Sequence, residues 1–182
     1  MTGDGLEPVD LTGRWVGFYR YRWEQLGSYP IVANLTQTGR RITGEMFDQI
    51  TDRSDYLETL RGVLGKDMSV QQRITLGVMI RRFGSDAVVN VRLPDTSDIE
   101  GRIKGSQVQF TKAYRGTLDA SWAVGEKQVL SYKRYGHKVH YSGHLDLEPM
   151  CIAGRWMITY GRFLDWILPP RDFGSFELYR KS

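Results

Sequence analysis

The sequence predicts an all-β protein whose antiparallel strands form a barrel, with a helical insertion around residues 52–83. Three observations lead to this fold class. A five-residue pattern with glycine at its centre and apolar residues at its ends occurs five times. Apolar residues alternate with polar ones along most of the chain, and this alternation stops between residues 51 and 83. The five copies of the pattern span residues 11–15, 42–46, 99–103, 141–145 and 152–156.

The repeated glycine indicates curvature. Residues two apart on a strand share a face, so each copy places its glycine and two apolar side chains on the same side of the sheet. A glycine inside a strand usually marks a bend, a bulge or the close approach of another group. Five such strands predict one strongly curved sheet with an apolar concave face, and therefore a barrel.

The predicted elements follow one another mostly as hairpins. Three strands come first, at Gly13–Tyr21, Tyr29–Thr36 and Arg41–Asp48. Spacing near three to four then predicts helix, with Ser69 as a cap. Residues 116–127 have no clear pattern. The later strands are expected at residues 86–93, 98–104, 108–114, 129–135, 138–145, 151–160 and 175–180. This hairpin succession favours a meander barrel over a Greek-key sandwich.

Composition limits the class of protein. The length of 182 residues suits one domain, expected at 11–182 after a flexible lead-in at 1–10. The net charge is +4 with no basic run, so neither nucleic acid nor a membrane is an expected partner; the oligomeric state stays open. The single Cys151 excludes an intramolecular disulfide. No signal peptide or membrane span is evident, and a cytoplasmic location is expected.

The start of the first strand carries a resemblance. Gly13-Arg14-Trp15, followed by Gly17-Phe18-Tyr19, resembles the G-x-W start of lipocalins, avidins and related calycin-type barrels. The resemblance covers residues 11–48 best. It implies an antiparallel up-and-down calycin-like β-barrel that is closed at one end and binds a small molecule at the other.

The resemblance also implies a structural role for one basic residue. Trp15 would plug the closed end, and Arg180 would pack over its ring by a cation–π contact, with Arg155 or Arg162 as alternatives. This chain departs from the family in its helical segment and in lacking disulfides. The ligand residues of avidins do not align with it, so none is carried over.

The three histidines lie within eight residues but do not form a metal site. His140 and His144 share a face about 13 Å apart along the strand, whereas ligands of one zinc ion lie about 2 Å from it. His137 has the opposite parity. We expect outward-facing histidines and no metal. Cys151 should also face outward, without an activating base.

Catalytic candidates are few. Asp48, at the barrel mouth, could act as a general acid or base, although Asp at the end of a strand often has a structural role. Arg162 could bind an anion. These two residues are the first to test, and their catalytic role stays unknown because no known catalytic or cofactor motif is present. No cofactor is expected.

The inward-facing side chains form the predicted binding site. An eight-stranded barrel is either filled by side chains or holds one small ligand, and the sequence leaves both open. The leading interpretation is a barrel that binds a small apolar or aromatic molecule in its interior. The alternatives are an enzyme acting on a small molecule at the mouth and a non-catalytic protein-interaction module with a filled core. The predicted ligand-binding residues are Trp15, Tyr19, Tyr21, Met46, Tyr141 and Trp156.

Overall fold

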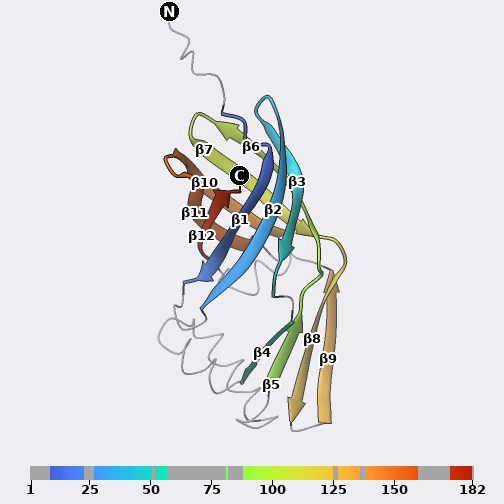
Figure 1. Cartoon of the computed structure of the whole chain (residues 1–182). Coiled ribbons are helices and arrows are strands. Elements are labelled where there is room, and N and C mark those ends of the chain that lie inside the picture. The colour runs from blue at the N-terminus through green and yellow to red at the C-terminus, as the bar shows by residue number, and fades with distance from the viewer. Residues whose placement is uncertain are drawn as a thin grey trace, which may run out of the picture.

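The computed structural model describes residues 9–22, 27–50, 52–56, 81, 88–124, 127–135, 138–159 and 173–181. Within these residues the strands form a closed eight-stranded barrel and a separate four-stranded sheet (Figure 1). The barrel comprises β1 (Gly13–Tyr21), β2 (Ser28–Thr38), β3 (Arg41–Asp48), β6 (Ser97–Lys104), β7 (Gln107–Tyr114), β10 (Lys138–Leu147), β11 (Met150–Thr159) and β12 (Phe173–Arg180). The second sheet comprises β4 (Asp52–Tyr56), β5 (Val88–Arg92), β8 (Thr117–Val124) and β9 (Lys127–Tyr135).

The barrel strands follow one another around the wall in chain order. The sequence β1-β2-β3-β6-β7-β10-β11-β12 returns to β1, and every pair is antiparallel. Two hairpins interrupt this meander, β4–β5 after β3 and β8–β9 after β7. They join through the β5–β8 pairing to form the second sheet. The predicted antiparallel up-and-down barrel is therefore confirmed.

The two ends of the barrel differ in their connections. One end, which we call the turn end, carries the two-residue turns 39–40, 105–106 and 148–149. The opposite end, the loop end, carries the longer connections and both hairpins. The four-stranded sheet extends beyond the loop end (Figure 1).

The prediction of a helical insertion is wrong for its first residues, 52–56. Asp52–Tyr56 forms strand β4, which pairs antiparallel with β5 some 35 residues later. Such pairing depends on backbone hydrogen bonds between distant segments. The spacing of apolar residues within one segment cannot predict it. The rest of the predicted insertion, at 57–80 and 82–83, lies outside the described residues. Residues 116–127, which showed no pattern, contribute strand β8.

The glycines of the inner face permit close approach of neighbouring strands. A Cβ on Gly17 would lie 1.8 Å from the Glu177 carbonyl oxygen. At Gly44 the nearest backbone oxygen, that of Asn34, would be 2.0 Å away. Real Cβ atoms do not come this close to backbone, so Gly17 and Gly44 mark close approaches of neighbouring strands. Of the pattern's other glycines, Gly101, Gly143 and Gly154 also approach a neighbouring backbone, whereas Gly13 does not.

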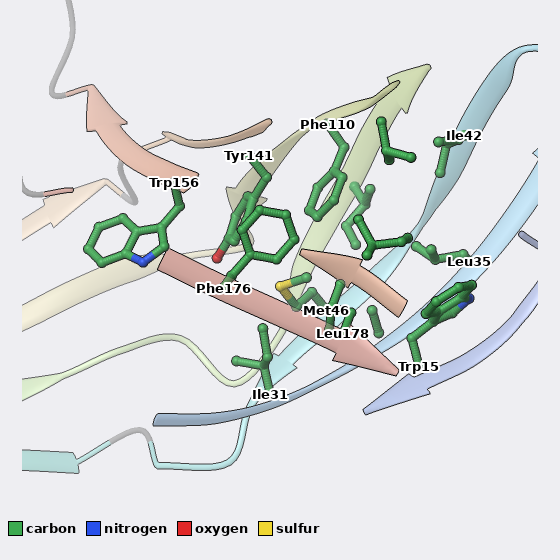
Figure 2. Packing of buried hydrophobic residues seen from close by; sticks show 14 of the residues in the cluster. Trp15, Ile31, Leu35, Ile42, Met46, Phe110, Tyr141, Trp156, Phe176 and Leu178 are labelled. Atoms are coloured by element: carbon green, nitrogen blue, oxygen red, sulfur yellow. The ribbon is translucent and has the colours of Figure 1, made fainter. Parts of the chain in front are cut away.

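The interior is filled along most of its length. Figure 2 shows labelled side chains packed from Trp156 at one end to Trp15 at the other. Trp15 is fully buried, and its indole Nε1 donates to the Leu11 carbonyl at 2.8 Å. Leu11 is itself fully buried, so this pair closes the turn end.

Arg180 lies beside Trp15 in the wall, because the two residues are Cα partners between β12 and β1. Its guanidinium donates to the carbonyl oxygens of Asp10 and Thr12, at 3.1 and 2.8 Å. The cation–π contact with Trp15 that the resemblance implied is not among the interactions of the described residues. Arg180 thus ties the segment before β1 to the last strand.

Replacing Gly17 by alanine tests the close approach. Because its Cβ would overlap the β12 backbone, we expect Gly17→Ala to lower the free energy of unfolding by about 3 kcal/mol or more. Gly105→Ala is the control, since a Cβ there meets nothing within 4 Å and only its positive φ costs about 1–2 kcal/mol. Urea denaturation measures both, and equal losses would contradict the argument.

Candidate functional site

A buried ion pair lies in the loop-end half of the barrel. Lys112 Nζ donates to Asp48 Oδ2, and the two side chains are 1% and 2% exposed. Asp48 ends β3 and Lys112 is on β7, with β6 between them in the wall. The ion pair therefore crosses β6 on the inner side of the barrel.

A small residue on β6 accommodates this crossing. Ser97 is fully buried and is the Cα partner of both Met46 and Tyr114. Its hydroxyl donates to the Met46 carbonyl at 2.7 Å, which satisfies the hydroxyl within the wall. Lys112 Nζ also lies 4.4 Å from the centroid of the Tyr114 ring, in cation–π contact.

One oxygen of the ion pair is unsatisfied. Asp48 Oδ1 is buried and has no hydrogen-bond partner among the residues that the structure describes. A buried acceptor left without a partner costs about 1–3 kcal/mol. Oδ1 is therefore available to accept a hydrogen bond from a molecule in the barrel.

The ion pair is a poor way to stabilise the fold. Removing each charge from water costs several kcal/mol, and well-packed apolar residues of similar volume often serve stability as well or better. Asp48 and Lys112 thus add polarity to the interior without an evident gain in stability. This points to a role in recognition or chemistry.

Four aromatic rings gather at the same end of the barrel. Tyr19 stacks on Tyr29 with their centroids 5.3 Å apart, and the edge of Trp156 meets Tyr19 at 5.6 Å and Tyr21 at 5.0 Å. We call Tyr19, Tyr21, Tyr29 and Trp156 the aromatic group. Tyr21 and Tyr29 are only partly buried, so the aromatic group forms the boundary between core and solvent.

Hydrogen bonds fix the orientation of Trp156. Its indole Nε1 donates to the carbonyls of Arg20 and Ser175, both at 3.0 Å. A Cβ on Gly174 would lie 2.9 Å from Nε1 and 1.8 Å from the Arg20 oxygen. The absence of a side chain at Gly174 on β12 therefore lets the indole of Trp156 extend from β11 across β12 to the Arg20 carbonyl on β1.

A second set of rings fills the middle of the barrel. Phe110 stacks on Tyr141 at a centroid distance of 4.6 Å, and Phe176 packs edge-on against both. Figure 2 shows these rings between Trp156 and the aliphatic side chains of the turn end. These rings and the turn-end side chains leave the loop-end side as the part of the interior that they do not fill.

The structure separates the predicted site residues into three positions. Tyr19, Tyr21 and Trp156 belong to the aromatic group, and Tyr141 lies in the middle of the barrel. Met46 and Trp15 are fully buried, and Trp15 lies at the turn end. Asp48 is inside the barrel at its loop end, whereas Arg162 lies outside the described residues.

Sequence reasoning missed Lys112, Tyr29 and Tyr114. The signal for Lys112 was present, because alternation along residues 107–114 gives it the parity of Val108 and Phe110. A charged residue at an inward position of a barrel strand is costly to bury unless an opposite charge pairs with it, so the parity of Lys112 predicts a buried acidic partner. Asp48 likewise shares the parity of Met46.

The outward-facing residues lie where they were predicted. His140 and His144 are on the outer face of β10, and His140 Nδ1 lies 3.1 Å from Thr111 Oγ1. His137 lies outside the described residues. Cys151 has the outward parity of β11 but is buried, and desolvation raises the pKa of its thiol.

The residues that the structure describes contain no group of three or more His, Cys, Asp or Glu side chains that could hold a metal ion. No helix among them is long and apolar enough to cross a membrane. In comparisons with family models, curated proteins and solved structures, no match to the chain was found.

The cost of the ion pair can be measured by substitution. Asp48→Ala leaves the buried Lys112 charge uncompensated, so we expect a loss of about 3–5 kcal/mol in the free energy of unfolding. The double variant Asp48→Val/Lys112→Met replaces both charges by apolar groups and should unfold within about 1.5 kcal/mol of the wild type. A double variant as unstable as Asp48→Ala would show that the ion pair stabilises the barrel.

Proposed function

We propose that the barrel binds a small aromatic molecule with a hydrogen-bond donor in the loop-end half of its interior. The observation that carries the proposal is the buried Asp48 Oδ1 without a partner, close to the aromatic group. Asp48 is the Cα partner of Ile31, and Tyr29 lies two residues along the same face of β2. Diagonal neighbours of this kind are about 7–8 Å apart, within reach of one ligand.

The chemistry of the site limits the class of ligand. The aromatic group offers ring faces and edges to a flat apolar body. Lys112 holds Oδ2, so the remaining oxygen accepts one hydrogen bond and selects molecules with an N–H or O–H group. Because side chains fill the middle and the turn end of the barrel, the ligand must be small.

This proposal narrows the residues predicted from the sequence. Tyr19, Tyr21 and Trp156 stay as contacts of the ligand, joined by Asp48 and Tyr29. Trp15 and Met46 lie in the filled part of the core, where they support the wall of the barrel.

Indole and benzofuran form a matched pair of probes, because they share a ring shape and differ in the N–H donor. We expect calorimetry to show that the wild type binds indole at least about tenfold more tightly, since benzofuran leaves Oδ1 unpaired. The double variant Asp48→Val/Lys112→Met should lose this preference while keeping its fold. Binding of neither probe by the wild type, or an unchanged preference in the double variant, would contradict the proposal.

A tyrosine substitution tests where the ligand lies. Tyr21→Leu removes a ring of the aromatic group at its partly exposed edge, and should weaken indole binding about 2–10-fold. Tyr179→Leu is the control, because Tyr179 is exposed on the outer face of β12. The same loss of affinity in both variants would place the bound indole elsewhere.

A further inference from the structure

The outer face of the barrel carries a groove of about 750 Å³, which we call the outer groove. It lies over β6, β7, β10, β11 and β12, and two rows of outward-facing residues form its surface. Within each row, consecutive residues are Cα partners on neighbouring strands. The polar row is Arg102, Gln109, Ser142 and Arg155; the second row is Glu100, Thr111, His140, Met157 and Phe173.

Three inward-facing glycines lie in the part of the wall beneath the outer groove. Gly101, Gly143 and Gly154 face inward there, and a Cβ on each would lie 2.2–2.5 Å from a carbonyl oxygen of the next strand. Gly143 and Gly154 are Cα partners, so the inner side of the wall carries no side chain at these two adjacent positions, whereas Gly101 lies opposite Phe110. The outer face is hollow over the same stretch.

The charges of the outer groove are unbalanced. Arg102 and Arg155 are exposed and form no ion pair with any other residue that the structure describes. Glu100 is the acidic residue of the lining, and Arg41 binds it at 2.9 Å. Two uncompensated guanidinium groups therefore flank Gln109 and Ser142, whose side chains add further hydrogen-bond donors.

An apolar patch adjoins one of these arginines. Met157 is two residues from Arg155 on the same face of β11, and its side chain is 40% exposed. Phe173 is the Cα partner of Met157 on β12 and is partly buried. Charged and apolar surfaces therefore lie next to each other in the outer groove.

We propose that the outer groove binds a small organic anion with an aromatic body. Guanidinium groups bind carboxylate and sulfonate oxygens with paired hydrogen bonds, and Arg155 can do so while the rings of the ligand lie on Met157 and Phe173. Arg102 contributes positive charge from the opposite side. The volume falls in the range of small-molecule sites, about 300–1,000 Å³. The wall of the barrel separates this site from the interior.

The test uses two fluorescent probes with the same rings. 8-Anilinonaphthalene-1-sulfonate carries a sulfonate, and N-phenyl-1-naphthylamine is the uncharged analogue. We expect the wild type to bind the sulfonate at least about tenfold more tightly than the analogue, because one charge-assisted contact is worth that factor. The ratio of the two affinities should fall when the sodium chloride concentration is raised from about 0.05 to 0.5 M, because salt screens the charge on the sulfonate.

Variants locate the bound probe. Arg155→Gln should weaken sulfonate binding about tenfold, Arg102→Gln less, and neither should change binding of the uncharged analogue. Arg14→Gln is the matched control, since Arg14 is an exposed arginine on the outer face of β1, outside the outer groove. Met157→Ser should weaken the binding of both probes by a similar factor, because both place the same rings on Met157.

Any one of four results would overturn the proposal. The wild type could fail to bind the sulfonate, the Arg155→Gln variant could bind it with unchanged affinity, or Arg14→Gln could cause an equal loss. The double variant Asp48→Val/Lys112→Met should leave sulfonate binding intact. A loss in that variant would place the probe in the interior and also count against the outer groove. Equal melting temperatures of the arginine variants confirm that they are folded.

Discussion

The close approach of neighbouring strand backbones at the inner glycines constrains the whole barrel. At three of these glycines the partner strand contributes a large side chain: Gly44 faces Leu35, Gly101 faces Phe110 and Gly174 faces Trp156. The interior is therefore filled by a few large rings that are supported from the opposite strand. These rings divide the barrel into a filled turn-end part and a loop-end part that contains polar groups.

The same constraint relates the two sites. Phe110, Tyr141 and Trp156 face the interior, and their atoms also border the outer groove. The interior offers a carboxylate oxygen that accepts a hydrogen bond, and the outer face offers guanidinium groups that donate. One bent wall thus presents opposite chemistry on its two sides, and the two classes of ligand should not compete.

The sequence was informative wherever the relevant signal was local. Alternation along each strand assigned the glycines and the aromatic site residues to the inner face, because parity needs only neighbouring residues. It also placed His140 and His144 outside. The glycine pattern predicted curvature and hence closure of the sheet.

Other features depend on contacts that no local pattern contains. Asp48 and Lys112 are 64 residues apart in the sequence. Their side chains meet because β3 and β7 both lie next to β6 in the wall. Strand β4 exists through its pairing with β5, which spacing along residues 52–56 does not reveal. The outer groove is lined by residues of five strands, so no single segment of the sequence predicts it. Arg180 bonds to backbone carbonyls, whose positions follow from the fold alone.

The pairing of β1 with β12 has a consequence for how the barrel folds. Arg180 donates to the carbonyl of Thr12 across 168 positions of the chain, and the register along this seam joins the most distant strands. Until β12 is present, the edges of β1 and β11 are unpaired and can recruit strands of other chains. Contacts of such long sequence separation are entropically costly to form, so we expect this seam to close after the local strand pairs have formed. An unclosed barrel with these two free edges is therefore the form of the chain that exposes most unpaired backbone to other chains.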